Sequence, residues 1–253
     1  MALLGGCSAA DRGDAAAKEK IASQPALGLM TTLPILWAEG DDFGAMLSAD
    51  AQSHWAFDVL GRSHDVIAVD LLTPEALASL DLLVLAQPRM LSAPENVALD
   101  DWVRGGGHAL IFADPLLTGH SEYGIGDKRR PQDVVLLDTI LARWGLILGS
   151  ATPRTETAFV SLGGGSLPLE AEGAFTRAEP ADGAQADCRD RLGAVLMICS
   201  IGQGRAVLLA DAAVLESHET PGLPVIAALQ ELLAMAGDGA SVDTAQKRGT
   251  TGE

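Results

Sequence analysis

The segment DLLVLAQP (residues 81–88) decides the fold class, because five consecutive apolar residues stand between an acidic residue and Gln-Pro. A short, unbroken apolar run of this kind is typical of a strand that is buried on both faces, as in a parallel sheet. The segment HALIFADP (residues 108–115) repeats the pattern further along the chain. Two such strands with a helix between them predict parallel pairing, since parallel strands need a crossover connection.

The stretch between these two strands carries the start and stop signals of a helix. Ser92 and Glu95 form a capping-box pattern, in which each side chain bonds the backbone amide of the other residue. The glycines at 105–107 end the helix. They do not predict a phosphate-binding loop, because a phosphate cradle runs strand, glycines, helix, and here the helix comes first. The apolar face of this helix contains Val97, Leu99, Trp102 and Val103.

The alternation of strands and helices continues in both directions. Before residue 81 we expect strands over residues 27–37 and 65–70, a helix around residues 52–60, and a second helix beginning at Thr73 and Pro74. After residue 115, apolar residues recur at helical spacing and predict a core-facing helix over residues 132–144 and a final helix later in the chain. The residues that carry these two patterns are Val134, Leu137, Leu141 and Trp144, and then Val225, Ile226, Leu229, Leu232 and Leu233.

Beyond residue 149 the pattern changes to shorter strands, glycine-rich turns and a polar run over residues 178–190. Residues 194–200 and 205–210 are β-type runs joined by Ile-Gly-Gln-Gly, which predicts a hairpin. The whole pattern predicts an α/β protein with a flavodoxin-like, mostly parallel sheet, helices on both faces, and a β-rich C-terminal portion that contains a hairpin.

The overall composition restricts the classes of partner. A chain of 253 residues with 48% hydrophobic residues can form a sizeable core. With 34 acidic against 17 basic residues and a formal net charge of −17, it has no basic patch that would neutralise a phosphate backbone, so we expect no nucleic-acid partner. The same charge repels anionic lipid headgroups, so association with a membrane requires a hydrophobic anchor.

The first residues match the signal for such an anchor. Residues 4–8, Leu-Gly-Gly-Cys-Ser, resemble a bacterial lipobox, so Cys7 is the predicted lipidation site; the alternative is an apolar N-terminus that contains a cysteine by chance. The basic and apolar leader of such a signal is expected upstream. Residues 26–37 are too short to span a bilayer as a helix. We expect residues 1–25 to be a lipobox remnant and flexible spacer, residues 26–236 the folded domain, and residues 237–253 a disordered tail.

The other two cysteines are Cys188 and Cys199. In an oxidising periplasm they can form a disulfide, and the alternative is a pair of free buried cysteines. A separation of more than about 7 Å between their Cα atoms would exclude the bridge.

The chain lacks the motifs of common catalytic sites on α/β folds. Amide hydrolases of this class place a cysteine nucleophile on the tight turn after a buried strand, but here that turn contains Gln87, Pro88 and Arg89. Residues 119–123, Gly-His-Ser-Glu-Tyr, depart from the Gly-x-Ser-x-Gly elbow at the last position. The five histidines lack the spacing of metal ligands. We therefore predict no nucleophile, no metal site and no cofactor.

Polar residues nevertheless gather where the strands end. In an open parallel sheet, ligands bind at the carboxyl ends of the strands. Trp37 ends the first expected strand, and His120 and Glu122 follow the strand that ends at residue 114. Such residues can converge on a cation or a polyol, but acids at strand ends also cap helices and brace loops, and both interpretations stay open. The candidate ligand-binding residues are Glu39, Asp41, Gln87, Asp114, His120 and Asp211.

Residues 80–88, 91–92, 98–107 and 109–115 together form a recognisable pattern: a strand ending in proline, a helix, a glycine pair, and a strand ending in Asp-Pro. This pattern resembles the domain of gliding-motility-type (GldG-like) auxiliary proteins of ABC-type transport systems, and residues 136–146 are similar to the same family. The resemblance implies a class I glutamine amidotransferase-like domain without the catalytic cysteine, located at the extracytoplasmic face. It also implies ABC transporter membrane or auxiliary subunits as partners.

The expected function is thus a non-catalytic, membrane-tethered periplasmic accessory or ligand-binding protein of an ABC-type transport system. Family members usually carry a membrane anchor, and lipidation of Cys7 would supply one here. The alternative is a hydrolase or sugar-modifying enzyme on an amidotransferase-like fold that uses the acids at the strand ends and His120. That alternative requires a concave, partly buried cluster with shifted pKa values.

Overall fold

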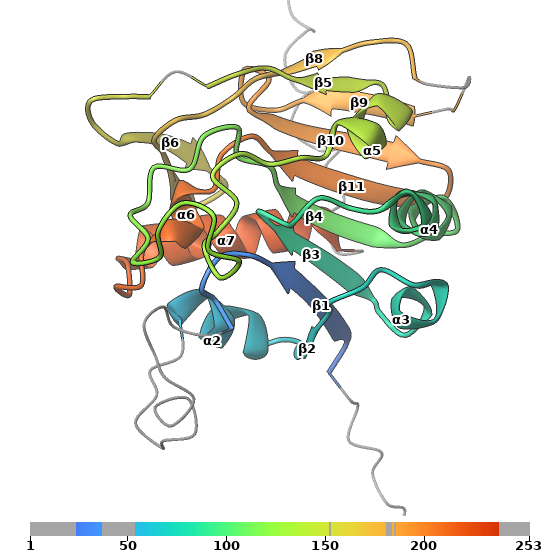
Figure 1. The fold of residues 1–253 in the computed structure, drawn as a ribbon, viewed down its shortest axis with the longest axis horizontal. Helices are drawn as coiled ribbons and strands as arrows, with labels where there is room; N and C mark the ends of the chain where they lie inside the picture. Colours follow the sequence, from blue (N-terminus) through green and yellow to red (C-terminus); the bar gives the residue numbers. More distant parts are fainter. Residues whose placement is uncertain (1–23, 37–53, 152, 181–183, 185, 238–253) are drawn as a thin grey trace, which may run out of the picture.

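A seven-stranded sheet forms the centre of the protein (Figure 1). The computed structural model describes residues 24–36, 54–151, 153–180, 184 and 186–237. The strand order is β2-β1-β3-β4-β11-β10-β9. These strands are β1 (Ala26–Thr31), β2 (Asp65–Ala68), β3 (Leu82–Ala86), β4 (His108–Phe112), β9 (Ala186–Asp190), β10 (Leu196–Ile201) and β11 (Gly204–Leu209).

The sheet is mostly parallel, as the sequence predicts. β1 pairs in parallel with β2 and β3, and β4 pairs in parallel with β3 and β11. The predicted hairpin is present, because β10 pairs antiparallel with β11 through a turn in which Gly202 has a φ of 61°. Only glycine adopts this backbone conformation without strain, which explains the glycine at the turn.

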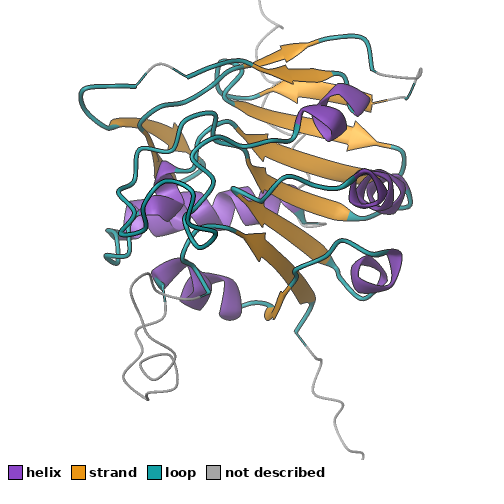
Figure 2. Cartoon of the chain, in the orientation of Figure 1, coloured by secondary structure: helices purple, strands orange, loops and turns teal. Residues whose placement is uncertain are grey.

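Helices cover both faces of the sheet, again as predicted (Figure 2). One apolar cluster joins α3 (Pro74–Ala78), α4 (Ala93–Arg104) and α5 (Asp138–Arg143) to one face. A second cluster joins α2 (Trp55–Gly61), α6 (Ala213–Glu216) and α7 (Leu223–Ala236) to the other face. The strands between these layers are buried on both sides, and all five residues of β3 are buried. This explains why the sequence of β3 is an unbroken apolar run.

Local signals fix the starts of two helices. The capping box of α4 is confirmed: the Ser92 amide donates to Glu95 Oε2 at 2.8 Å, and the Glu95 amide donates to Ser92 Oγ at 3.4 Å. Thr73 caps α3 by accepting a hydrogen bond from the Ala76 amide at 3.2 Å. Gly105 terminates α4, and Gly106 turns the chain toward β4 with a φ of 115°.

The prediction of a helix over residues 132–144 is wrong for residues 132–137. Only Asp138–Arg143 is helical. Val135 and Leu137 are buried while Val134 and Leu136 are exposed, which is the alternation of an extended chain. The Val135 amide donates to the carbonyl oxygen of Asp114 at 3.0 Å, so this segment runs beside the loop after β4. Four consecutive apolar residues are compatible with the periodicity of a helix and with that of an extended chain. The hydrogen bond to the Asp114 carbonyl favours the extended conformation.

The first strand is also shorter than predicted. β1 ends at Thr31, whose hydroxyl oxygen accepts a hydrogen bond from the Leu33 amide at 2.9 Å and starts a turn. Trp37, Glu39 and Asp41 lie outside the described residues, as do most of residues 1–25 and residues 238–253, including Cys7. The expectations for a spacer, a tail and lipidation therefore stay predictions.

Two small antiparallel sheets supply the β-rich C-terminal portion. β5 (Leu146–Leu148) pairs with β8 (Phe175–Arg177), and β6 (Ala158–Leu162) pairs with β7 (Gly165–Leu169). β7 packs directly on α7, where a Cβ atom at Gly165 would overlap the backbone of Ala228. Within the described part of the chain, no helix has the length and apolar character of a membrane-spanning segment.

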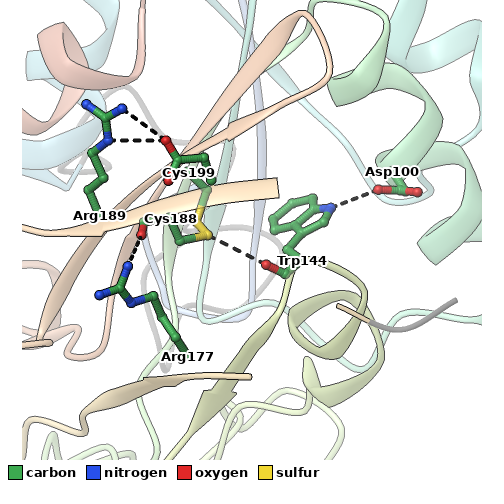
Figure 3. Close-up of a disulfide and its surroundings, with 7 residues drawn as sticks. Asp100, Trp144, Arg177, Cys188, Arg189 and Cys199 are labelled. Atoms are coloured by element: carbon green, nitrogen blue, oxygen red, sulfur yellow. Dashed lines mark hydrogen bonds and ion pairs between the residues drawn. A yellow bond between two sulfur atoms is a disulfide. The ribbon is translucent and has the colours of Figure 1, made fainter. Parts of the chain in front are cut away.

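A disulfide joins Cys188 on β9 to Cys199 on β10 (Figure 3). The two residues are directly opposite each other in the antiparallel ladder, and their Cα atoms are 3.9 Å apart, within the limit for a bridge. Both are buried. Trp144 packs beside them and donates its indole N–H to Asp100 Oδ1 at 2.9 Å. The bridge therefore attaches the edge strand to a buried corner of the domain.

Candidate functional site

The carboxyl ends of β1, β3, β4 and β11 meet at one edge of the sheet, because these strands are mutually parallel. In open parallel sheets this edge is where ligands bind. The structure places Gln87, Asp114 and Asp211 here, one after each of β3, β4 and β11. The three residues lie close together, and the side chain of each makes hydrogen bonds to the backbone of neighbouring loops.

Gln87 is fully buried and has a φ of 47°, in the left-handed region that is unfavourable for residues other than glycine. Its side-chain amide nitrogen donates to the carbonyl oxygens of Asp114 at 3.0 Å and Gln132 at 2.8 Å. Its side-chain oxygen accepts from the Asp114 amide at 2.9 Å. Both amide protons are therefore used inside the protein. Gln87 braces the loops after β3 and β4.

Asp114 and Asp211 are braces as well. Asp114 accepts hydrogen bonds from the amides of Leu116 at 2.7 Å and Ala212 at 2.8 Å. Asp211 accepts from the amides of Ala213 at 2.7 Å and Glu170 at 2.9 Å. Each carboxylate thus joins its own loop to a neighbouring one. This matches the loop-bracing interpretation of acids at strand ends.

Burial shifts the protonation equilibria of both carboxyls. Burial raises the pKa of Asp114 above its ordinary value. Burial raises the pKa of Asp211 to about 7, and the nearby charge of Asp114 adds to the rise, although hydrogen bonds from backbone amides oppose it. Asp211 is fully buried and Asp114 is 1% exposed, so water does not screen their repulsion.

Beside these braces the loops enclose a small cavity, which we name the strand-end cavity. Its volume is about 50 Å³, which is several times the roughly 10–15 Å³ that one water molecule needs. His120 lies in its wall, as the sequence suggested for a site residue, but Asp114 and Asp211 do not line it. The lining residues are Leu33, Pro34, Leu117, Gly119, His120, Ser121, Arg130, Pro131, Asp133, Glu216 and His218.

Glu216 is one of the two acidic residues in the cavity wall, the other being Asp133. Its carboxylate accepts hydrogen bonds from the Gly119 amide and, at 3.3 Å, from the Thr118 hydroxyl. The approach is close enough that a Cβ atom at position 119 would lie 2.5 Å from Glu216 Oε2, so a larger residue there would displace the Glu216 carboxylate. Burial raises the pKa of Glu216 to about 7, and the charges of Asp114, Glu170 and Asp211 contribute to the rise.

Arg130, Asp133 and His218 also line the cavity. Arg130 pairs with Asp133 at 2.7 Å and donates to the carbonyl oxygen of Tyr123 at 2.8 Å. The ring of His218 lies edge-on to the ring of His54, with 5.1 Å between the centroids. His54 is buried behind the wall, and burial, together with the charge of His218, lowers its pKa to about 4.

Sequence reasoning did not find Glu216, Arg130, Asp133 or His218. No motif singles them out, because they reach the cavity from loops that are distant in sequence; Gly119 and Glu216 are 97 residues apart. Among the residues that the structure describes, no group of three or more histidine, cysteine or acidic side chains is arranged to hold a metal ion. The cavity wall is therefore a set of hydrogen-bonding groups backed by apolar surfaces.

Residues 24–150 match the model of a family described as an ABC-type uncharacterized transport system. The match covers 127 of the 253 residues and contains β1 to β4. The chain belongs to this family. It is thus an auxiliary component of an ABC-type transport system, which confirms the class of protein that the sequence pattern resembled. No curated protein sequence matches the chain significantly.

Solved structures of several classes are similar to this chain at low identity. An exo-β-1,4-mannosidase from an Opitutaceae bacterium (strain TAV5) aligns over 84% of this chain and 33% of its own length, with 12% identity and a TM-score of 0.44. A β-galactosidase from Rahnella sp. R3 aligns over 84% and 31%, with 11% identity and a TM-score of 0.46. This chain therefore spans about a third of these glycosidases.

A cytoplasmic protein from Salmonella typhimurium aligns over 84% of this chain and 99% of its own length, with 12% identity and a TM-score of 0.48. At such identities and scores, none of these similarities carries information about activity.

Proposed function

We propose that this protein is a non-catalytic accessory or ligand-binding domain that works beside the membrane subunits of its transport system. The observation that supports this most is Gln87. It occupies the sharp, left-handed turn after β3, where an amide hydrolase of related architecture would place its nucleophile. Its amide group is committed to neighbouring loops, so this turn is used for bracing rather than for chemistry.

The strand order supports a flavodoxin-like sheet with an amidotransferase-like arrangement. The run β2-β1-β3-β4-β11 corresponds to the order 2-1-3-4-5 of flavodoxin-like proteins. Together with the family membership, this favours a GldG-like component, which pairs such a domain with transporter subunits.

Crosslinking in the native cell followed by capture of the full-length protein tests the proposed partnership. The expected result is co-capture of a membrane subunit of an ABC-type transporter. A matched control is a capture from cells in which that subunit is deleted. If the subunit is never crosslinked although the accessory protein is abundant, the proposed partnership is wrong.

We further propose that the domain lies in the periplasm and is tethered by a lipid on Cys7. The Cys188–Cys199 disulfide supports an oxidising compartment. Both ends of the described chain lie at the edge of the sheet where the parallel strands begin. Pro25, just before β1, accepts a hydrogen bond through its carbonyl oxygen from the amide of Asp65, the first residue of β2, at 3.0 Å. The carbonyl oxygen of Ala236, at the end of α7, lies 2.7 Å from Nδ1 of His108, the first residue of β4. A tether would therefore join the domain at the edge of the sheet opposite the strand-end cavity.

Metabolic labelling with a fatty acid tests the anchor. The native gene with its own upstream region should yield labelled protein in the membrane fraction, and Cys7→Ala should be unlabelled and released. Cys188→Ser is a suitable control, because it alters a cysteine without touching the lipobox. Equal labelling of the wild type and Cys7→Ala would exclude lipidation at this position.

A second candidate function is a hydrolase or sugar-modifying enzyme. The observation that favours it is Glu216, a carboxyl with a pKa of about 7 in the same cavity wall as His120 and His218. Such a group suits general acid or base catalysis. This candidate predicts that a panel of glycoside and ester substrates contains one whose turnover falls at least about 100-fold in Glu216→Gln. Absence of turnover across the panel would favour the binding role.

A further inference from the structure

The strand-end cavity has a wall that carries both signs of charge. The wall contains the ion pair of Arg130 and Asp133, and it contains Glu216. Arg130 and Asp133 offset each other's charge, and the pKa of Glu216 is raised to about 7, so that its carboxyl is partly neutral near that pH. The wall therefore carries little net charge with which to hold an ion. An ion that enters a partly enclosed site loses hydration that such a wall does not replace, so the wall favours a ligand without net charge.

The charged groups of the wall are already held by the protein. The Arg130 guanidinium contacts Asp133 through two nitrogens, at 2.7 and 3.1 Å, and also donates to the Tyr123 carbonyl. A zwitterion would have to break this ion pair in order to use its charges. A neutral hydroxyl group can instead be added to the pair, because it both donates and accepts hydrogen bonds.

The remaining wall also suits hydroxyl groups attached to carbon. Ser121, His120 and His218 provide groups that can donate or accept. The wall also contains the aliphatic side chains of Leu33, Pro34, Leu117 and Pro131, against which C–H groups can pack. Sites for small molecules combine such apolar surfaces with a few placed polar groups.

We propose that the strand-end cavity binds a small, neutral polyhydroxy compound. This inference deepens the binding role proposed above and rests on it, but not on the identity of the transporter. A volume of about 50 Å³ admits a short polyol or one edge of a monosaccharide rather than a longer chain. Glu216 is held by Gly119 in a fixed position and orients one hydroxyl of the ligand.

Ligand-observed NMR with the purified full-length protein tests the proposal. The probes are erythritol and glucose as neutral polyols, ethanolamine as a cation, inorganic phosphate as an anion, and alanine as a zwitterion. Saturation transfer to at least one polyol is expected, with none of the charged probes binding more tightly.

Two variants locate the binding. His120→Trp places a large side chain at an exposed wall position and should weaken polyol binding at least 10-fold. His64→Trp makes the same change in a separate groove at the end of α2 and should leave binding unchanged. The proposal is overturned if no polyol binds at millimolar concentration, if a charged probe binds best, or if His120→Trp binds as the wild type does. Capture of the transporter subunit by His120→Trp tests the proposed partnership separately.

Discussion

The Gln87 side chain and the Asp114 backbone exchange two hydrogen bonds, because the amide nitrogen of Gln87 donates to the Asp114 carbonyl at 3.0 Å and its oxygen accepts from the Asp114 amide at 2.9 Å. The side chain thereby imitates a further step of the β3–β4 ladder at the point where the two strands end. This brace sets the separation of the loops that form the strand-end cavity, and it predicts a large energetic effect of substitution.

Gln87→Ala removes these two bonds and the bond to the Gln132 carbonyl, and it leaves a buried amide without a partner. Buried unpaired groups cost about 1–3 kcal/mol each, so we expect a loss of about 3 kcal/mol in the free energy of unfolding. Urea denaturation followed by circular dichroism measures it. Gln203→Ala, at the exposed turn between β10 and β11, is the control and should cost little. A loss below about 0.5 kcal/mol at Gln87 would contradict the bracing role.

The buried carboxyls of Asp211 and Glu216 should together make the protein less stable as the pH rises from about 4 to about 7, against the opposite contribution of His54, whose pKa is lowered to about 4. The pKa of Asp211 is about 7 in the folded protein, above its value of about 4 in an unfolded chain, so the folded state binds the proton more tightly. The stabilising contribution is fully present below pH 4 and is lost as the pH rises through 7. Glu216 acts in the same direction. Each group changes the free energy of unfolding by up to about 1.4 kcal/mol per pH unit in this window.

Thermal unfolding between pH 5 and pH 8 checks this expectation. The melting temperature should be higher at pH 5, and the dependence should weaken in Asp211→Asn, even though that variant is less stable because an amide cannot accept both backbone bonds. Asp65→Asn, at an exposed position of β2, should keep the slope of the wild type. A melting temperature that rises toward pH 8 would refute the assignment.

Glu95 should produce the opposite pH dependence at lower pH. The hydrogen bonds of Arg89 lower the pKa of Glu95 to about 2, and the Ser92 hydroxyl and amide add to this effect. The stabilising contribution is therefore present above about pH 4.5 and is lost as the pH falls toward 2. Glu95→Gln should cost about 2 kcal/mol at pH 7, since it removes the ion pair with Arg89 and the charge that strengthens these hydrogen bonds, although a glutamine can keep the capping-box bond to the Ser92 amide. Asp101→Asn, on the exposed side of the same helix, is the control in equilibrium denaturation.

Reduction of the disulfide should destabilise the protein. A bridge across a sequence separation of 11 residues contributes about 3 kcal/mol in the chain-entropy view. The free energy of unfolding should fall by this order on addition of a reductant, and hydrogen exchange should increase first in β9, which is held only by β10 within the sheet. The double variant Cys188→Ser and Cys199→Ser should be insensitive to the reductant. Equal stability of the reduced and oxidised wild type would show that the bridge has no stabilising role.

Much of the architecture follows from signals that are local in the sequence. The apolar run of residues 82–86 needs burial on both faces, Ser92 and Glu95 start a helix, and the glycines at 105–107 end it. Each of these signals acts within a few residues, so the order strand, helix, strand is specified without contacts between residues far apart in the chain. The parallel order of β1, β3 and β4 then follows from the crossover connections.

Tertiary structure alone decided the rest. The apolar residues from Val134 to Leu137 are compatible with a helix or an extended chain, and a hydrogen bond to the Asp114 carbonyl selected the latter. Gln87, Asp114 and Asp211 could be placed at the strand ends from the sequence, but their use as braces depends on amides that other loops bring to them. Glu216 became a cavity residue only because folding sets it against Gly119 and surrounds it with three other carboxyls. Strand ends are fixed by local pattern, whereas the loops that complete a site are fixed by contacts between residues far apart in the chain.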